Sequence, residues 1–256
     1  MSIYDVVGKT PEQLEEEVKK AEEEKAEEKR ENGRRFEEPV YTGINLDVDT
    51  LTRNTKRYYV YGSGREELPE EIAAKVTGYV QRLWNKDYVL RVNPEDRQNS
   101  LAKKAYIAAS APREVNGEIV TGTEVFLPWQ AMNKAIPSLV KKPTELAHRT
   151  AIWIAKQVYK SDEEKYNNRE SYFKAFDATL VHLLLGKSCT EPVDFMIIYT
   201  KDGYTELPKG VDFKDLDFQH SKLMQIAKLF DIKIYNLGNN DSIMELEQFL
   251  GSVVEA

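Results

Sequence analysis

The run Tyr58-Tyr59-Val60-Tyr61-Gly62-Ser63-Gly64-Arg65 decides the fold class of this chain. Its first four residues are aromatic or β-branched, which is typical of a strand, and the glycines that follow end that strand. From Leu68 to Trp84 the apolar residues then recur at helical spacing. A strand that leads through a glycine turn into an amphipathic helix predicts an α/β fold.

The rest of the chain after residue 41 repeats this alternation. We expect strands at 58–61, 88–92, 124–127, 193–199 and 232–236, and a tight hairpin at the Asn-Gly pair of 115–118. We expect helices at 68–84, 100–109, 143–160, 171–185, 221–230 and 242–250. This alternation predicts a mainly parallel sheet covered by helices, with the apolar run 193–199 as a buried central strand.

Residues 1–40 predict a charged helical arm. Thr10 can cap the helix, Pro11 suits its first position, and Glu15 and Lys19 have the favourable spacing for an ion pair. The apolar side is thin, so the arm buries little surface. We expect it to be solvated or to join a protein partner, with residues 41–256 forming the globular domain.

Composition narrows the classes of partner. The 256 residues carry a net charge of -7, whereas domains that coat nucleic acid are usually basic. The one cysteine, Cys189, excludes a disulfide within the chain. The start Met1–Asp5 lacks the pattern of a secretory signal, and no apolar run approaches the roughly 20 residues that span a bilayer. The sequence therefore predicts a cytoplasmic protein with no membrane partner.

The carboxyl ends of the predicted strands nominate a ligand site, because ligands of open parallel sheets bind there. Glycines permit close backbone approach, a helix start offers free N–H groups, and Arg65 can pair with an anion. A strand-to-helix turn without a ligand explains the same residues equally well. The residues expected to bind a ligand are Gly62, Ser63, Gly64, Arg65, Asn93, Arg97, Thr200, Asp202, His220 and Asn236.

Four motifs in this order resemble the SLOG superfamily, and most closely its small phage-encoded members. They are Tyr61-Gly62-Ser63-Gly64-Arg65, the strand 124–129 ending in Leu-Pro-Trp, the strand 192–203 ending in Thr-Lys-Asp-Gly, and Ile232–Leu237. The superfamily comprises Rossmann-like domains that include DNA-processing recombination mediators, lysine-decarboxylase-like hydrolases and sensors of nucleotide-derived signals. The resemblance spans 57–238 and implies a Rossmann-like fold, a nucleotide-like ligand and, for a phage protein, the cytoplasm of the host cell.

The chain departs from the family pattern at three places. The loop 91–99 contains no glycine, residues 218–221 replace a Gly-Gly-Thr helix start, and the stretch 177–180 lacks the Arg-Asn pair of related phage proteins. A loop without glycine cannot wrap a phosphate so closely with its backbone N–H groups. These losses predict a degenerate active site.

The side chains that could do chemistry are few. His148 and His182 lie beside apolar residues in predicted helices, which favours structural roles, and no motif places a histidine beside Cys189. We therefore expect Cys189 to be an ordinary, partly buried thiol. No pair of histidines shares metal-ligand spacing with a carboxylate, so neither a metal nor a cofactor is predicted.

The leading hypothesis is a binding module for a nucleotide or nucleotide-derived ligand, with little or no catalysis. The alternatives are a structural protein of a phage assembly that uses its arm, a hydrolase of nucleotide N-glycosidic bonds, and a recombination mediator that binds single strands. The last would use cations and aromatic residues such as Lys56, Arg57, Tyr58, Tyr61 and Trp84. Small-ligand binding is preferred to it, because strand alternation points Tyr58 and Tyr59 to opposite faces.

Overall fold

The computed structural model describes most of the chain from residue 56 onward. The described residues are 56–64, 67–94, 96, 99–115, 118–128, 141, 143–158, 171–208 and 218–252. All of them fall within Leu46–Ala256, which forms one compact unit. The arm expected at 1–40 lies outside the described residues.

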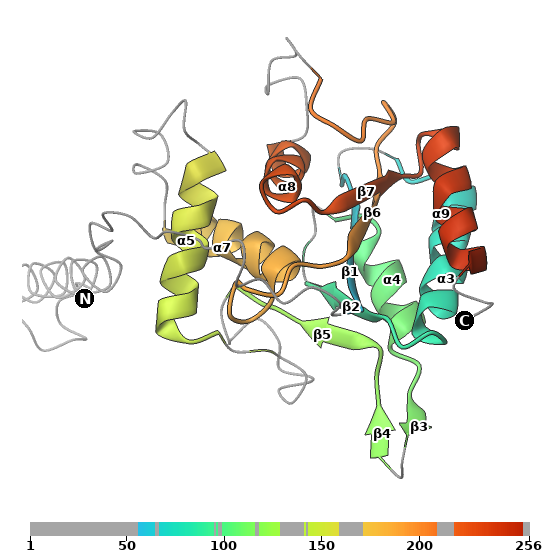
Figure 1. Cartoon of the computed structure of the whole chain (residues 1–256), viewed down its shortest axis with the longest axis horizontal. Coiled ribbons are helices and arrows are strands. Elements are labelled where there is room, and N and C mark those ends of the chain that lie inside the picture. The colour runs from blue at the N-terminus through green and yellow to red at the C-terminus, as the bar shows by residue number, and fades with distance from the viewer. Residues whose placement is uncertain are drawn as a thin grey trace, which may run out of the picture. The chain divides into compact units, whose positions relative to one another are not determined.

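The core of the domain is a five-stranded sheet in which every neighbouring pair is parallel (Figure 1). In spatial order its strands are β5 (Thr123–Val125), β2 (Val89–Val92), β1 (Arg57–Gly62), β6 (Phe195–Tyr199) and β7 (Lys233–Asn236). The chain therefore builds outward from β1 to one edge, and then returns to build β6 and β7 on the other side. This 3-2-1-4-5 order is that of a Rossmann-like sheet, so the expected fold class is confirmed.

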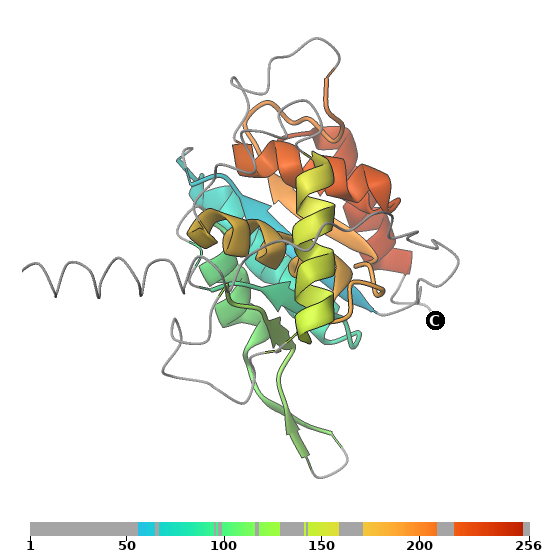
Figure 2. The ribbon, with the colours of Figure 1, turned by 90° about the vertical axis from the view of Figure 1, so that its left-hand side faces the viewer.

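Six helices of the described part of the chain cover the two faces of the sheet. One face carries α3 (Glu70–Trp84), α4 (Ala102–Ala109) and α9 (Asn240–Ser252). The other carries α5 (Glu145–Val158), α7 (Ser171–Leu185) and α8 (Phe218–Leu229). Seen from the side, α5 lies nearest the viewer and outside α7 (Figure 2). Within the described helices, none is long and apolar enough to cross a membrane.

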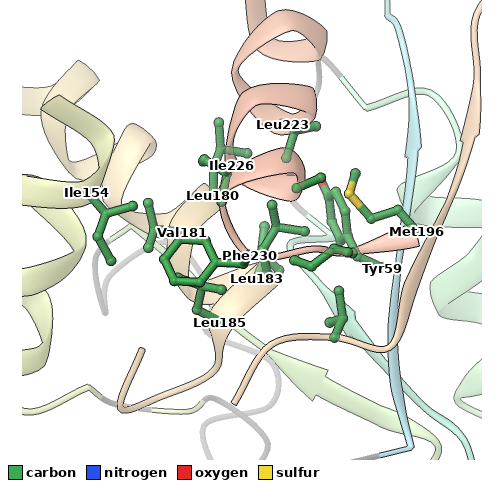
Figure 3. Close-up of a cluster of buried hydrophobic side chains, with 14 of the residues drawn as sticks. Tyr59, Ile154, Leu180, Val181, Leu183, Leu185, Met196, Leu223, Ile226 and Phe230 are labelled. Carbon is green, nitrogen blue, oxygen red and sulfur yellow. The ribbon is translucent and has the colours of Figure 1, made fainter. Parts of the chain in front are cut away.

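Strand β1 lies at the centre of both cores, and Tyr58 and Tyr59 are each 0% exposed. Tyr58 packs in the cluster beneath α3, α4 and α9, whereas Tyr59 packs in the cluster beneath α5, α7 and α8. Figure 3 shows Tyr59 and Met196 of the sheet facing Leu183 of α7 and Leu223 of α8. The prediction that the two tyrosines face opposite ways is confirmed.

The helices follow the predicted apolar faces with one exception. In α3 every residue of the predicted face is buried: Ile72, Val76, Tyr79, Val80 and Leu83. The helical spacing of the apolar residues in 171–185 predicts that Phe173 lies on the buried face of α7, and this is wrong, because its side chain is 44% exposed. All residues from Asp177 to Leu185 are buried, including those off the apolar stripe. Burial in α7 therefore depends on position along the helix, since its second half lies among the sheet, α5 and α8.

A two-stranded hairpin projects from the connection between α4 and β5 (Figures 1 and 2). Its strands are β3 (Arg113–Val115) and β4 (Glu118–Val120), which pair antiparallel as the Asn-Gly signal predicts. The base of the hairpin is closed by a hydrogen bond of 3.0 Å from Gly122 N to Ala109 O. A Cβ atom on Gly122 would lie 2.7 Å from the Trp84 ring, so this position requires glycine.

We predict opposite effects from removing the two neighbouring hydroxyls of β1. Tyr58 Oη is buried and has no hydrogen-bond partner among the described residues, whereas Tyr59 Oη accepts a bond of 3.2 Å from Asn99 Nδ2. Tyr58→Phe should therefore leave the free energy of unfolding unchanged or raise it by up to about 1 kcal/mol, and Tyr59→Phe should lower it by about 1 kcal/mol. Urea unfolding of the two variants checks this. Equal losses from both would contradict it.

Candidate functional site

The topology brings two of the predicted loops together at the carboxyl edge of the sheet. Gly62 of β1 pairs with Tyr199 of β6, so the chain leaves the sheet side by side at Ser63 and Thr200. From this point the connection after β1 runs to the face of α3, whereas that after β6 leads to α8 on the other face. Such a divergence of connections is the crevice in which ligands of open α/β sheets bind.

Polar residues are concentrated along this edge. Those that are buried there are Ser63, Asn93, Asp96, Asn99, Thr200, Asn236 and Ser242. Burying a polar group is unfavourable unless it is hydrogen-bonded, so we expect partners close to these residues.

The amide of Asn99 ties the loop after β2 to the end of β1. Its Oδ1 atom accepts hydrogen bonds of 3.0 Å from the backbone N–H groups of Gly62 and Ala102. Its Nδ2 atom donates to Val60 O at 2.9 Å and to Tyr59 Oη at 3.2 Å. One side chain therefore supplies partners for the end of a strand and for the start of α4. We conclude that Asn99 positions the edge.

Gly62 is required by the packing of this same loop. A Cβ atom at Gly62 would lie 2.7 Å from Ser100 Oγ and 2.8 Å from Leu101 Cγ. The space that the missing side chain leaves is thus filled by the protein itself. The neighbouring Gly64 is exposed, so Gly64 is the glycine of this turn that a ligand can approach.

Asn236 performs a matching role between β6 and β7. Its Nδ2 atom donates to Thr200 Oγ1 at 2.7 Å and to Tyr204 O at 2.6 Å, and its Oδ1 atom accepts from Thr200 N at 3.2 Å. Thr200 in turn donates to Asp202 Oδ1 at 2.6 Å. The structure thus brings together three of the predicted residues, Thr200, Asp202 and Asn236, in one hydrogen-bonded group.

Two glycines let the loops after β6 and β7 touch. Gly203 has a φ of +72°, and a Cβ atom there would lie 2.8 Å from Gly238 O. A Cβ atom at Gly238 would lie 2.0 Å from Thr200 O. Both loops are therefore held backbone to backbone. The exposed residues Lys201 and Asp202 project from this rigid base.

The remaining predicted residues are placed differently. Asn93 is buried directly after β2, and Arg65 and Arg97 lie outside the described residues. His220 falls within the first turn of α8, and its side chain also lies outside the described part. The helix after β1 begins only at Glu70, with Glu70 and Glu71 in its first turn. These carboxylates already complement the helix dipole, so the start of α3 is a poorer anion site than the sequence suggests.

A second polar cluster, which the sequence did not predict, lies between α5, α7 and β2. Cys189 Sγ is 3.6 Å from His182 Nδ1, and His182 Nδ1 is 3.0 Å from Gly186 O. The rings of Phe126 and His148 lie nearly parallel to that of His182, each with its centroid 6.1 Å away. Gly186 directly follows α7, and its φ of +76° lets the chain reverse direction there. In the sequence, a glycine at the end of the predicted helix 171–185 is the one feature that indicates this turn.

The electrostatics of this cluster disfavour nucleophilic chemistry. Burial raises the pKa of Cys189 to about 12, against the opposing charge of Arg91. Burial also lowers the pKa of His182 to about 4. At neutral pH both groups are therefore uncharged, whereas a catalytic cysteine needs a thiolate. The sequence predicts a partly buried thiol, and the structure shows that Cys189 is almost fully buried, with 1% of it exposed.

A buried arginine connects this cluster to the sheet. Arg91 of β2 is 1% exposed and forms an ion pair of 3.0 Å with Glu124 of β5, which also pairs with Arg57 at 3.0 Å. Arg91 Nη1 donates to Glu191 O at 2.6 Å. Burial tends to raise the pKa of Glu124, but the two arginines outweigh it and hold the pKa below its usual value. The network links three strands to the loop before β6.

Comparisons with known proteins do not assign this site to a family. Neither a family model, nor a curated protein, nor a solved structure matches the chain. Among the described residues, no group of three or more His, Cys, Asp or Glu side chains is arranged to hold a metal ion. Fold and edge together define the class of protein, a Rossmann-like α/β domain with a polar carboxyl edge.

We predict that Asn99 contributes much more to stability than an asparagine that only caps a helix. Asn99→Ala would remove the side-chain acceptor of the N–H groups of Gly62 and Ala102, of which Ala102 N keeps only a bond of 3.3 Å to the backbone oxygen of residue 99. It would also remove the donor to Val60 O and Tyr59 Oη, so the loss should be about 3 kcal/mol of the free energy of unfolding. Asn239, which is half-buried, accepts from Asp241 N and Ser242 N, so Asn239→Ala should cost about 1 kcal/mol. Similar losses in chemical unfolding would contradict the role of Asn99.

We also predict that His182 destabilises the protein in acid. Its pKa is about 4 in the folded state against 6.5 for the free side chain, so below pH 6.5 the unfolded state binds a proton that the folded state does not. Stability should fall as the pH falls from about 6.5 to about 4, by about 3 kcal/mol in total. The fall between pH 7 and pH 4 should shrink by this amount in His182→Gln. An unchanged pH profile in that variant would disprove the assignment.

Proposed function

We propose that this domain binds a nucleotide or a nucleotide-derived ligand at the carboxyl ends of β1 and β6, and does not turn it over. The observation that carries the proposal is the 3-2-1-4-5 strand order, which makes the space between these two strands the point of divergence. The exposed Gly64 and Lys201 flank that point and can offer a backbone N–H group and a positive charge to a phosphate.

The rigidity of the edge supports binding of a small, polar ligand. Asn99 and Asn236 hold the loops through hydrogen bonds that are already made without a ligand. The described parts of these loops are therefore held in place before a ligand binds, which lowers the conformational entropy that binding costs.

Two observations weigh against the other hypotheses. The one thiol of the chain, with its neighbour His182, is buried away from the carboxyl edge and carries no charge at neutral pH, which disfavours covalent catalysis there. Tyr58, Tyr61 and Trp84 are all buried, so they cannot stack on the bases of a single strand. Ligand binding is therefore preferred to catalysis by the thiol and to strand binding through these aromatic residues.

A thermal-shift screen with AMP, ADP, cyclic AMP, NAD and ADP-ribose tests the proposal. A ligand that binds only the folded state at 100 times its Kd adds about 2.7 kcal/mol. For a domain of this size such a gain corresponds to a rise in Tm of roughly 5–10 °C. No shift with any of the five, combined with a large assembly in light scattering, would overturn the proposal and favour the interaction protein.

Two lysines at opposite ends of β6 provide a matched pair of variants. Lys201 follows the carboxyl end of the strand and Lys187 lies in the loop before its amino end, and both are exposed. We expect Lys201→Glu to raise the Kd for a phosphate-bearing ligand about tenfold, equivalent to about 1.4 kcal/mol. Lys187→Glu makes the same change of charge and should leave the Kd unchanged. Equal effects from the two would show that the ligand binds elsewhere.

A further inference from the structure

The interface between α7 and α8 contains an ion pair that neither the fold nor the site described above requires. Lys222 Nζ of α8 contacts Asp177 Oδ1 of α7, and their side chains are only 6% and 4% exposed. Their sequence neighbours Leu223 and Ala178 are each 0% exposed and belong to the apolar core (Figure 3 labels Leu223). The pair therefore lies against a hydrophobic cluster.

The pair lies near the middle of both helices, slightly toward their carboxyl-edge ends. The last turn of α7 is joined to the amino edge, since Val193 N, two residues before β6, donates to Leu184 O at 2.7 Å. α8 ends at Leu229, just before Lys233 begins β7. Both helices thus run from the carboxyl edge toward the amino edge. Asp177 and Lys222 each fall before the midpoint of their helix.

Stability alone does not explain this arrangement. Removing two charges from water costs about as much as their attraction returns, and apolar side chains of similar volume often stabilise such a position equally well or better. An ion pair differs from apolar side chains in how precisely it fixes the packing of two helices. Apolar surfaces can pack together in several ways, whereas a buried charge is stable only when its partner lies within reach. In α8 the residues Ser221–Met224 are all buried, so a rotation of the helix would bury Lys222 away from Asp177.

We propose that the Lys222–Asp177 pair fixes the position of α8 on α7 and is a positioning element for the carboxyl edge, not a source of net stability. When the pair is formed, it fixes where α8 begins relative to the carboxyl edge, at the end of the loop that follows β6. The expectation that the pair affects ligand binding rests on the function proposed above. The expectation that the pair fixes the position of α8 does not depend on that function.

The experiment replaces both members of the pair by apolar residues of similar length. In Lys222→Met with Asp177→Leu we expect the midpoint of urea unfolding to equal or exceed that of the wild type. In the same protein, the backbone amides of α8 should exchange with solvent at least tenfold faster, measured relative to those of α3. Lys222→Met alone removes this partner from a buried carboxylate and should give a lower midpoint than the double variant. The exposed pair Lys233–Glu245 (N–O 2.7 Å), replaced in the same way, is the control and should change neither quantity.

Ligand binding gives a separate measurement. With the member of the five-ligand screen described above that most stabilises the wild type, the Kd of the double variant should rise at least fivefold. A double variant as unstable as the single variant, or one whose α8 amides exchange at the wild-type rate, overturns the inference. An unchanged Kd overturns its consequence for the site. If none of these nucleotides binds the wild type, the proposed function fails, and the exchange of α8 still decides the inference.

Discussion

The arrangement of this domain depends on the complete enclosure of one strand. The backbone of β1 is paired on both sides, by β2 and by β6, and its residues from Tyr58 to Gly62 are buried. Parallel neighbours cannot be joined by a short turn, so each needs a long connection that crosses a face of the sheet. Covering both faces then requires that connections on the two sides of β1 go opposite ways. The crevice between β1 and β6 is therefore a consequence of burying β1.

The open ends of the parallel strands pose a second problem, because backbone groups there have no further strand to pair with. The protein solves it with two amide side chains, Asn99 on one side of the crevice and Asn236 on the other. An amide carries both donors and acceptors, so one residue can complete the ends of two chain segments at once. The polar groups of Asn99 and Asn236 are thus already hydrogen-bonded to the loops that they position. What remains for a ligand is the outer layer around Gly64, Lys201 and Asp202.

The sequence predicted the strands, the helices and the parallel sheet, because each depends on local periodicity and turn residues. Within helices it predicted faces correctly where one side meets the sheet, as in α3, and failed for Phe173, where enclosure by other helices decides burial. It also nominated Thr200, Asp202 and Asn236, which do come together. It could not show that Gly62 makes room for Leu101, or that Lys222 meets Asp177, since these contacts join distant segments. Such pairings leave no periodic signal in one chain.

The hairpin formed by β3 and β4 has a separate consequence. The chain enters and leaves it at a single point, where Gly122 is hydrogen-bonded to Ala109, so the crossover from α4 to β5 is already closed beneath it. The path of the chain from α4 to β5 therefore does not depend on the length of the hairpin. Its tip can therefore lengthen, shorten or accept an inserted domain during evolution without altering the order of the sheet, and it is the natural place to splice in a reporter.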